Sequence, residues 1–337
     1  MVETCEELQA AFDLTKTQDV VIEMAGSADI NCVEFTTMSM DSNTLIVEAS
    51  GDGTLNLYEI RFEVTNGAKL TWEPNVHFHG TDDRDANGGG VFVGEGSTIR
   101  FLNDLTMTDV EVTSVPEESE DSASYTLSGG CVYTDGYFRV DGKATLTRCD
   151  VAGGGEASPG PGGALYVGEE GFVLFNGELE ISEASIRDDD GSNGAGIYNL
   201  GKVNIKGDAV FDDLSAEVGG AIFNGKNAEF RFKKGAKALF RACSAAYDEP
   251  TALYNQGYFK FSGPAEFVEM DAPSIITYGK LVLSEDSVFY SDDDVSSPAV
   301  IVGAGGELTV PSSVLFVKSN AEIDCSTVYY RDEDTCL

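Results

Sequence analysis

Carboxylates are the side chains in this chain whose spacing could most directly do chemistry, because they gather in short runs. The runs hold Asp82, Asp83 and Asp85, the segment 117–121, then Asp188, Asp189 and Asp190, and finally Asp292, Asp293 and Asp294. Hard cations such as Ca²⁺ take six to eight oxygen ligands, which adjacent carboxylates supply. The chain has no EF-hand loop and no Gly-Gly-x-Gly-x-Asp array, so the Ca²⁺ hypothesis rests on charge alone. The alternative is that the runs are solvated loop tips.

A second candidate site contains the only two histidines of the chain, His77 and His79. In a strand, residues two apart lie on the same face, so both imidazoles would point the same way. With Asp82 and Asp83 nearby they could bind a metal ion. The alternative interpretation is that they are two exposed polar positions on an ordinary strand.

Cationic residues are few, and five of them lie close together in the sequence: Arg231, Lys233, Lys234, Lys237 and Arg241. They could form one positive patch that binds a carboxylated or sulfated sugar, and the alternative is a solvated corner that balances local charge. A lyase acting on uronates needs such a cation as its base, together with a basic groove.

Other catalytic arrangements have little support in the sequence. Acid pairs of glycoside hydrolases need a fixed separation and a partly apolar site, and loop tips are the opposite environment. We find no Ser, His and Asp arrangement and no phosphate-binding loop. The sequence therefore predicts no catalytic residue and favours a non-catalytic role, with a carbohydrate-active enzyme, or its inactive relative, as the alternative.

The formal net charge of −37 excludes several partners. Nucleic acids require clusters of Lys and Arg to displace counterions, and anionic lipid surfaces repel such a chain in the same way. No stretch of about twenty apolar residues is present to cross a bilayer. We expect a soluble protein that attracts cations, with polysaccharides or components of a cell surface or matrix as partners.

Seven cysteines are present, and four of them fall in two pairs near the ends of the chain. We predict disulfides between Cys5 and Cys32 and between Cys325 and Cys336, where each would close a short terminal loop. A bridge between Cys131 and Cys149 stays open, and Cys243 is interpreted as a small buried apolar residue. Disulfides indicate an oxidising compartment, so we expect a secreted or cell-surface protein whose signal peptide has been removed.

A repeated pattern must position all of these residues. Two small residues, often Gly-Gly, precede an apolar residue and an aromatic one in residues 88–93, 129–134, 162–167, 194–199, 219–224 and 250–255, with divergent copies at 273–278 and 297–302. The interval shrinks from roughly 41 to roughly 23 residues, which suits one turn of a parallel β-helix. Segments such as 202–206 and 229–233 alternate apolar and polar residues, as strands do. A third short apolar piece follows a Phe, so each rung would contain three strands.

These repeats resemble the Gly-Gly-Ala-Ile and Phe-x-x-Asn repeats of polymorphic outer-membrane proteins, within the pectin-lyase-like superfamily of right-handed β-helices. The resemblance implies an all-β, right-handed parallel β-helix, and it covers roughly residues 88–320. Many members of that superfamily are polysaccharide lyases, hydrolases or epimerases. The family's Asn position is filled by Cys149, Leu214, Cys243, Met270 and Asp292, so we expect that this chain has no intact interior Asn ladder.

One elongated domain of about eleven rungs is expected. It would begin with a helical cap at 1–18, continue with irregular rungs at 19–87 and regular repeats at 88–320, and end in a tail at 321–337.

Two further sets of residues recur along the chain, one aromatic and one made of Thr pairs. The aromatic residues that recur in phase, namely Tyr133, Tyr166, Tyr198, Phe223 and Tyr254, are predicted to stack inside the coil. The Thr pairs 106/108 and 145/147 are interpreted as isolated, which disfavours an ice-binding face. A structural, adhesive or glycan-binding scaffold with an acidic edge is the leading hypothesis.

Overall fold

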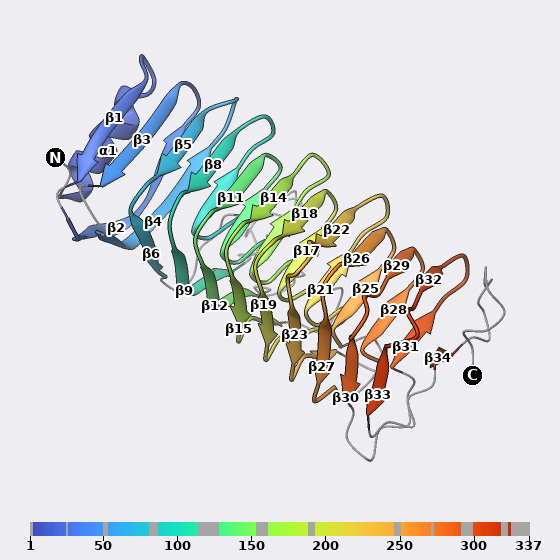
Figure 1. Ribbon diagram of the computed structural model, residues 1–337. Coiled ribbons are helices and arrows are strands. Elements are labelled where there is room, and N and C mark those ends of the chain that lie inside the picture. Colours follow the sequence, from blue (N-terminus) through green and yellow to red (C-terminus); the bar gives the residue numbers. More distant parts are fainter. Residues whose placement is uncertain are drawn as a thin grey trace, which may run out of the picture.

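The computed structural model shows an elongated coil of stacked parallel strands, with the first and the last described strands at opposite ends of the coil (Figure 1). It describes residues 3–24, 26–49, 53–80, 87–113, 128–152, 161–187, 193–245, 251–270, 273–290, 299–317 and 323–324. The predicted all-β parallel solenoid is confirmed.

One strand from every rung lies in the first sheet, whose eleven strands run parallel in chain order. They are β1 (Val20–Met24), β3 (Thr44–Ala49), β5 (Lys69–Trp72), β8 (Thr98–Phe101), β11 (Tyr137–Val140), β14 (Phe172–Phe175), β18 (Lys202–Ile205), β22 (Glu229–Phe232), β26 (Tyr258–Phe261), β29 (Lys280–Val282) and β32 (Glu307–Thr309). The described part of the coil therefore has eleven rungs, in line with the approximately eleven expected from the repeats.

The second and third faces share one large sheet, because the long early strands continue from one face to the next. The second face contains β2 (Ala28–Met40), β4 (Thr54–Val64), β6 (Asn75–His79), β9 (Leu105–Thr113), β12 (Ala144–Ala152), β15 (Leu179–Ser182), β19 (Ala209–Asp212), β23 (Ala238–Arg241), β27 (Ala265–Val268), β30 (Val288–Tyr290) and β33 (Leu315–Val317). The first half of β4 pairs with β6 and its second half pairs with β7.

The third face begins at β7 (Val91–Val93) and continues with β10 (Val132–Thr134), β13 (Leu165–Val167), β17 (Ile197–Asn199), β21 (Ile222–Asn224), β25 (Leu253–Asn255), β28 (Ile275–Thr277), β31 (Val300–Val302) and β34 (Ile323–Asp324). Three very short strands, β16 (Ile186–Arg187), β20 (Ser215–Ala216) and β24 (Ser244–Ala245), lie just beyond the second face. Each regular rung thus has the three strands that the sequence predicts.

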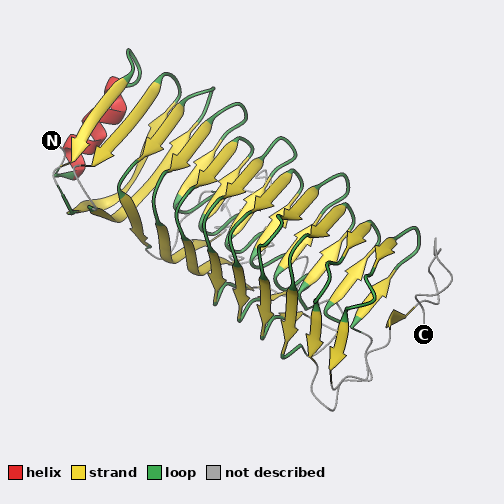
Figure 2. Ribbon diagram, viewed as in Figure 1, coloured by secondary structure: helices red, strands yellow, loops and turns green. Residues whose placement is uncertain are grey.

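A helix, α1 (Cys5–Leu14), closes the N-terminal end of the coil (Figure 2). It begins at a capping box in which Thr4 and Glu7 satisfy each other's backbone amides, an arrangement that stabilises helix starts. Leu8 and Phe12, one turn apart, are completely buried, and the Phe12 ring stacks on Phe62 of β4 at 5.3 Å. The helix covers apolar surface that a first rung would otherwise expose.

Apolar side chains fill the interior in ladders that follow the strand register. Phe211, Phe240, Phe267 and Phe289 lie on successive rungs with nearly parallel rings, and their centroids are 4.9, 4.9 and 4.5 Å apart. Each is at most 2% exposed. Stacked rings at this spacing add to the burial of apolar area.

An interior row of amides was not anticipated. Asn199 donates from Nδ2 to Oδ1 of Asn224, Asn224 donates likewise to Asn255, and Asn255 donates to Oγ1 of Thr277, each at 2.8 Å. All four side chains are 0% exposed. At the position expected from the family resemblance, Cys149, Leu214, Cys243 and Met270 are buried apolar residues. The interior Asn ladder is therefore present, but at the last residue of the third-face strands.

The aromatic ladder lies on the opposite side of its sheet from the one predicted. Phe92, Tyr133, Tyr166, Tyr198, Phe223 and Tyr254 are half-buried on the outside of the third face, and successive centroids are 4.6 to 5.4 Å apart. In each strand the residues on both sides of the aromatic one point inward, so alternation turns the aromatic ring outward. Tyr254 pairs in register with Ile276, and not with Thr277 as the repeat alignment suggested.

Candidate functional site

The eight acidic residues predicted to contact a cation all lie outside the described residues. They are Asp82, Asp83, Asp188, Asp189, Asp190, Asp292, Asp293 and Asp294. Cys325 and Cys336 also lie outside them. The acidic, cation-binding edge and the C-terminal disulfide therefore stay predictions.

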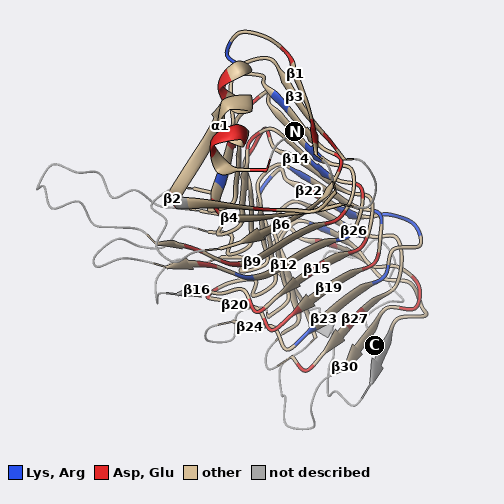
Figure 3. Ribbon diagram, turned by 90° about the vertical axis from the view of Figure 1, so that its left-hand side faces the viewer, with Lys and Arg blue, Asp and Glu red and all other residues tan. Residues whose placement is uncertain are grey.

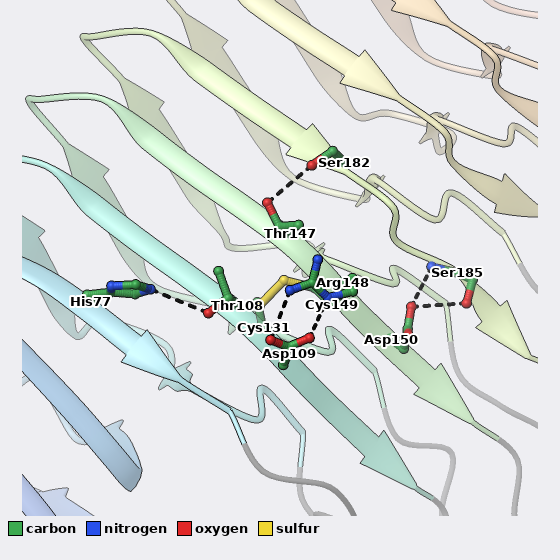
Figure 4. Close-up of a disulfide and its surroundings, with 10 residues drawn as sticks. All are labelled: His77, Thr108, Asp109, Cys131, Thr147, Arg148, Cys149, Asp150, Ser182 and Ser185. Carbon is green, nitrogen blue, oxygen red and sulfur yellow. Dashed lines mark hydrogen bonds and ion pairs between the residues drawn. A yellow bond between two sulfur atoms is a disulfide. The ribbon is translucent and has the colours of Figure 1, made fainter.

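Two disulfides are present in the described part of the chain. Cys5 is bonded to Cys32, as predicted, which ties α1 to β2. Cys131, which directly precedes β10, is bonded to Cys149 of β12 across 18 residues of sequence, so this bridge closes a loop within one rung (Figure 4). Cys243 is free and buried, and burial raises the pKa of its thiol to about 12. The two bridges indicate an oxidising environment.

A row of left-handed residues marks the corner after the second face. It consists of Glu59, Asp109, Arg148, Glu183, Asp213, Ala242 and Glu269, whose φ angles lie between 48° and 58°. Within this row Arg148 donates to both carboxylate oxygens of Asp109, with Nη2 3.0 Å from Oδ2, and to Glu183 at 3.3 Å. The hydrogen bonds from Arg148 lower the pKa of Asp109. Figure 4 shows the pair beside the disulfide.

The five cations that could have formed one patch are divided between two faces and a corner. Arg231 and Lys233 lie on the outside of the first sheet. Arg241 lies on the second face, where it pairs with Asp212. Lys237 is at a corner, and its backbone amide donates to Asp208 at 2.9 Å. The hypothesis of a single patch is wrong, because alternation and the corner between strands point these neighbours in different directions.

The outer surface of the first sheet instead gathers cations from several rungs into what we call the basic strip. The strip consists of Arg100, Arg139, Lys202, Lys206, Arg231, Lys233 and Lys260. Arg100 is paired in register with Arg139, and Arg231 is paired with Lys260. Strands in a sheet are about 4.8 Å apart, so the two charges of each pair lie about that far apart along the coil, and Leu174 and Asn204 occupy the line between the two pairs. The end-on view in Figure 3 shows Lys and Arg positions on this sheet.

Mutual repulsion within the basic strip affects Lys233. Partial burial lowers the pKa of Lys233, and the positive charges of Arg231, Lys206 and Lys260 lower it further, against the opposing effect of Glu229. The Arg231 guanidinium also lies over the Tyr258 ring, 5.0 Å from its centroid. The strip therefore gathers positive side chains on a protein that is acidic as a whole, and some of them are paired with carboxylates, among them Arg139 with Asp141 and Arg231 with Glu229.

Aromatic residues share the outer surface of the first sheet with these cations. Tyr137 and Phe172 are paired in register, their ring centroids are 5.4 Å apart, and Tyr258 occupies the same line of the sheet three rungs beyond Phe172. All three are half-buried. In contrast, the rings of the third-face ladder stack on one another, and Arg61 lies over the terminal Phe92 at 5.5 Å. The third-face ladder thus stabilises the coil and offers few open ring faces.

The histidines lie where the sequence predicts, on one face of β6. Their ring centroids are only 3.8 Å apart, and both side chains are half-buried, not exposed as the alternative interpretation expected. Burial and the neighbouring His79 lower the pKa of His77. Within the described ranges, no group of three or more His, Cys, Asp or Glu side chains is arranged to hold a metal ion.

The Thr pairs are adjacent and not isolated. Thr106 is in register with Thr145, and Thr108 with Thr147, because the long segment between the two pairs makes up one full rung. The array ends after two rungs, at His77 and His79 on one side and at Glu180 and Ser182 on the other. A long regular Thr face is therefore absent from the second face as described.

Comparison of the chain with protein-family models, with curated proteins and with solved structures finds no match. In the described part of the chain, no helix combines the length and the apolar character needed to span a membrane.

Proposed function

We propose that this protein is a non-catalytic, secreted or cell-surface β-helix scaffold that binds an acidic glycan along the basic strip. The observation that carries the proposal is the alignment of Arg100, Arg139, Arg231 and Lys260 with half-buried aromatic residues on one flat sheet surface. Guanidinium groups bind carboxylates and sulfates through paired hydrogen bonds.

The register supports a linear ligand. Along the coil, Arg100 and Arg139 form one pair of neighbouring cations and Arg231 and Lys260 form another. Leu174 and Asn204 occupy the two rungs between the pairs, so a linear acidic chain that follows the coil axis can meet both pairs. Tyr137, Phe172 and Tyr258 offer apolar ring surface between the charges. The net charge of −37 repels every polyanion at long range, the acidic glycan included, so binding depends on close ion pairs with the strip. Those pairs should weaken as salt rises.

A second candidate function, cleavage of a uronate polymer by a lyase reaction, is favoured by one observation. The pKa of Lys233 is lowered by burial and by Arg231, and a lysine with a lowered pKa is a better base at neutral pH. This candidate also agrees with the resemblance of the repeats to the pectin-lyase-like superfamily of right-handed β-helices.

Binding of polygalacturonate, and of an uncharged glucan as the reference polymer, tests the proposal. We expect the triple variant Lys206→Ala, Arg231→Ala, Lys260→Ala to bind polygalacturonate at least about tenfold more weakly. The matched control is Lys16→Ala, Lys143→Ala, Arg241→Ala, which removes the same charge away from the strip and should bind as the native protein does. Equal losses in both variants, or no binding by the native protein, would contradict the proposal.

The same samples distinguish a lyase from a scaffold. A lyase produces unsaturated uronates that absorb ultraviolet light, and Lys233→Gln would abolish that signal. A scaffold binds the polymer and leaves its length unchanged.

A further inference from the structure

The only two imidazoles of the chain are brought together on the second face, away from the basic strip. His77 and His79 are alternate residues of β6, so both project from the outer side of the sheet. Their ring centroids are 3.8 Å apart, with 36° between the ring planes. The two rings are in van der Waals contact.

Neighbouring rungs hold both rings in place. Tyr58 of β4 stacks on His79, with centroids 4.4 Å apart and 6° between the planes. Thr108 of β9 lies on the other side, where its Oγ1 is 3.4 Å from Nε2 of His77 (Figure 4). When the Thr108 hydroxyl accepts a hydrogen bond from Nε2–H of His77, the lone pair of Nδ1 is left available to a metal ion, the usual arrangement around metal-bound histidines.

We propose that His77 and His79 together bind a divalent transition-metal ion, with Cu²⁺ bound most tightly and Zn²⁺ and Ni²⁺ more weakly. Imidazole nitrogens bind such ions at about 2.0–2.1 Å, and rings already in contact converge on one ion by side-chain rotation alone. Cu²⁺ leads the affinity order for nitrogen ligands. The positions that pair with the two histidines in β9, 106 and 108, carry neutral Thr hydroxyls and no carboxylates. Water molecules therefore complete the coordination of the metal ion.

The charge around the pair suits a cation. Asp109 is close enough to His79 for that ring to influence its pKa, and the chain as a whole is strongly negative. The carboxylate of Asp109 is hydrogen-bonded to Arg148. It therefore adds to the negative electrostatic potential at the site but does not coordinate the ion. Ca²⁺ prefers oxygen ligands, which separates this site from the acidic runs.

Calorimetric titration of the full chain with CuCl₂, followed by electron paramagnetic resonance, tests the site. We expect one Cu²⁺ per chain and a spectrum showing coupling to two imidazole nitrogens. His79→Phe keeps an aromatic ring on Tyr58 but removes both nitrogens, and His77→Phe does the same at the other position. Each single variant should bind Cu²⁺ at least about tenfold more weakly, while the melting temperature without metal stays close to that of the native protein.

Three results would overturn the proposal. They are the absence of Cu²⁺ binding by the native chain, unchanged binding by the double Phe variant, and a spectrum with no nitrogen coupling. Titration with CaCl₂ serves as the control, since any Ca²⁺ bound should be equal in the native chain and both variants.

Discussion

Asn224 donates a hydrogen bond to Asn255 over 2.8 Å in the fully buried interior of the coil. Its own Oδ1 accepts from Asn199, so one side chain joins three rungs. Amides inside a protein are costly when left without a partner. The row is therefore stable only as a whole, and removal of a central member affects both neighbours.

Replacing Asn224 with Ala is expected to lower the free energy of unfolding by about 2–4 kcal/mol, because Asn199 loses an acceptor and Asn255 loses a donor. Guanidinium denaturation followed by circular dichroism measures the change. Asn204→Ala, on the outer surface of the first sheet, is the matched control and should change stability by less than about 0.5 kcal/mol. Equal stability of both variants would show that the buried row contributes nothing.

The disulfide between Cys131 and Cys149 should contribute substantially, since it restricts an unfolded loop of 18 residues. We expect the double variant Cys131→Ala, Cys149→Ala to lose about 2–4 kcal/mol of unfolding free energy, measured without reducing agent. The same variant should be less sensitive to dithiothreitol than the native protein. If reductant lowers both melting temperatures by the same amount, the stabilising bridge lies elsewhere.

The outer aromatic ladder predicts a loss of stability at high pH. Burial, followed by the charges of Tyr198, Asp135 and Glu169, raises the pKa of Tyr166 to about 12, against about 10 in an unfolded chain. The folded state therefore holds its phenol proton more tightly. The stability that this provides is complete below about pH 10 and is lost as the pH rises toward about 12.

Tyr166→Phe should keep the stacking, since Phe92 and Phe223 already occupy equivalent positions, and should flatten the decline of melting temperature between about pH 10 and about pH 12. Tyr290→Phe, at an exposed position, is the control and should follow the native curve. If the native protein and both variants show the same dependence of melting temperature on pH, Tyr166 is not the cause of the loss of stability at high pH.

At the corner row, Ala242 adopts a φ of 48°, a conformation that costs residues other than Gly about 1–2 kcal/mol. Ala242→Gly is expected to raise the free energy of unfolding by about 0.5–1 kcal/mol, after allowance for the greater freedom of Gly in the unfolded chain. Ala238→Gly, at an ordinary buried strand position, should lower it by a similar amount. Chemical denaturation should therefore show changes of opposite sign in the free energy of unfolding of the two variants. Changes of the same sign would show that the backbone at Ala242 is not strained.

The repeats predicted the fold because rungs pack so closely before the third face that only small residues fit there. A Cβ added at Gly130 would lie 2.4 Å from the carbonyl oxygen of Gly163, so the small residues before the third face record where rungs approach one another. The helical cap was readable for a similar reason, since Leu8, Ala11 and Phe12 have helical spacing.

Sidedness was harder to predict than strand position. A period of two separates the residues of a strand into two sets but does not say which set faces inward. Aromatic size suggested an interior aromatic ladder, which in fact lies outside, and the interior Asn ladder was expected to be broken, whereas it is present at other positions. The signal was nevertheless available in the third-face strands, because Ile222 and Asn224 alternate together and Ile222 had to be buried.

The basic strip could not be predicted from neighbouring residues. Arg100, Arg139, Arg231 and Lys260 are far apart in the sequence and separated by unequal intervals. Only the register brings them into one line. The five cations that do lie together in the sequence point to different faces, because a corner separates the first sheet from the second.

The row of buried amides also gives the coil a direction of disassembly. Every amide donates toward the C-terminal rungs, and the row stops at Thr277, where the following rung presents Val302. The N-terminal end, in contrast, is closed by α1 and fastened by the bridge from Cys5 to Cys32. Under heat or mechanical load, the described rungs beyond Thr277, which the amide row does not join, should separate before the rungs that the row links.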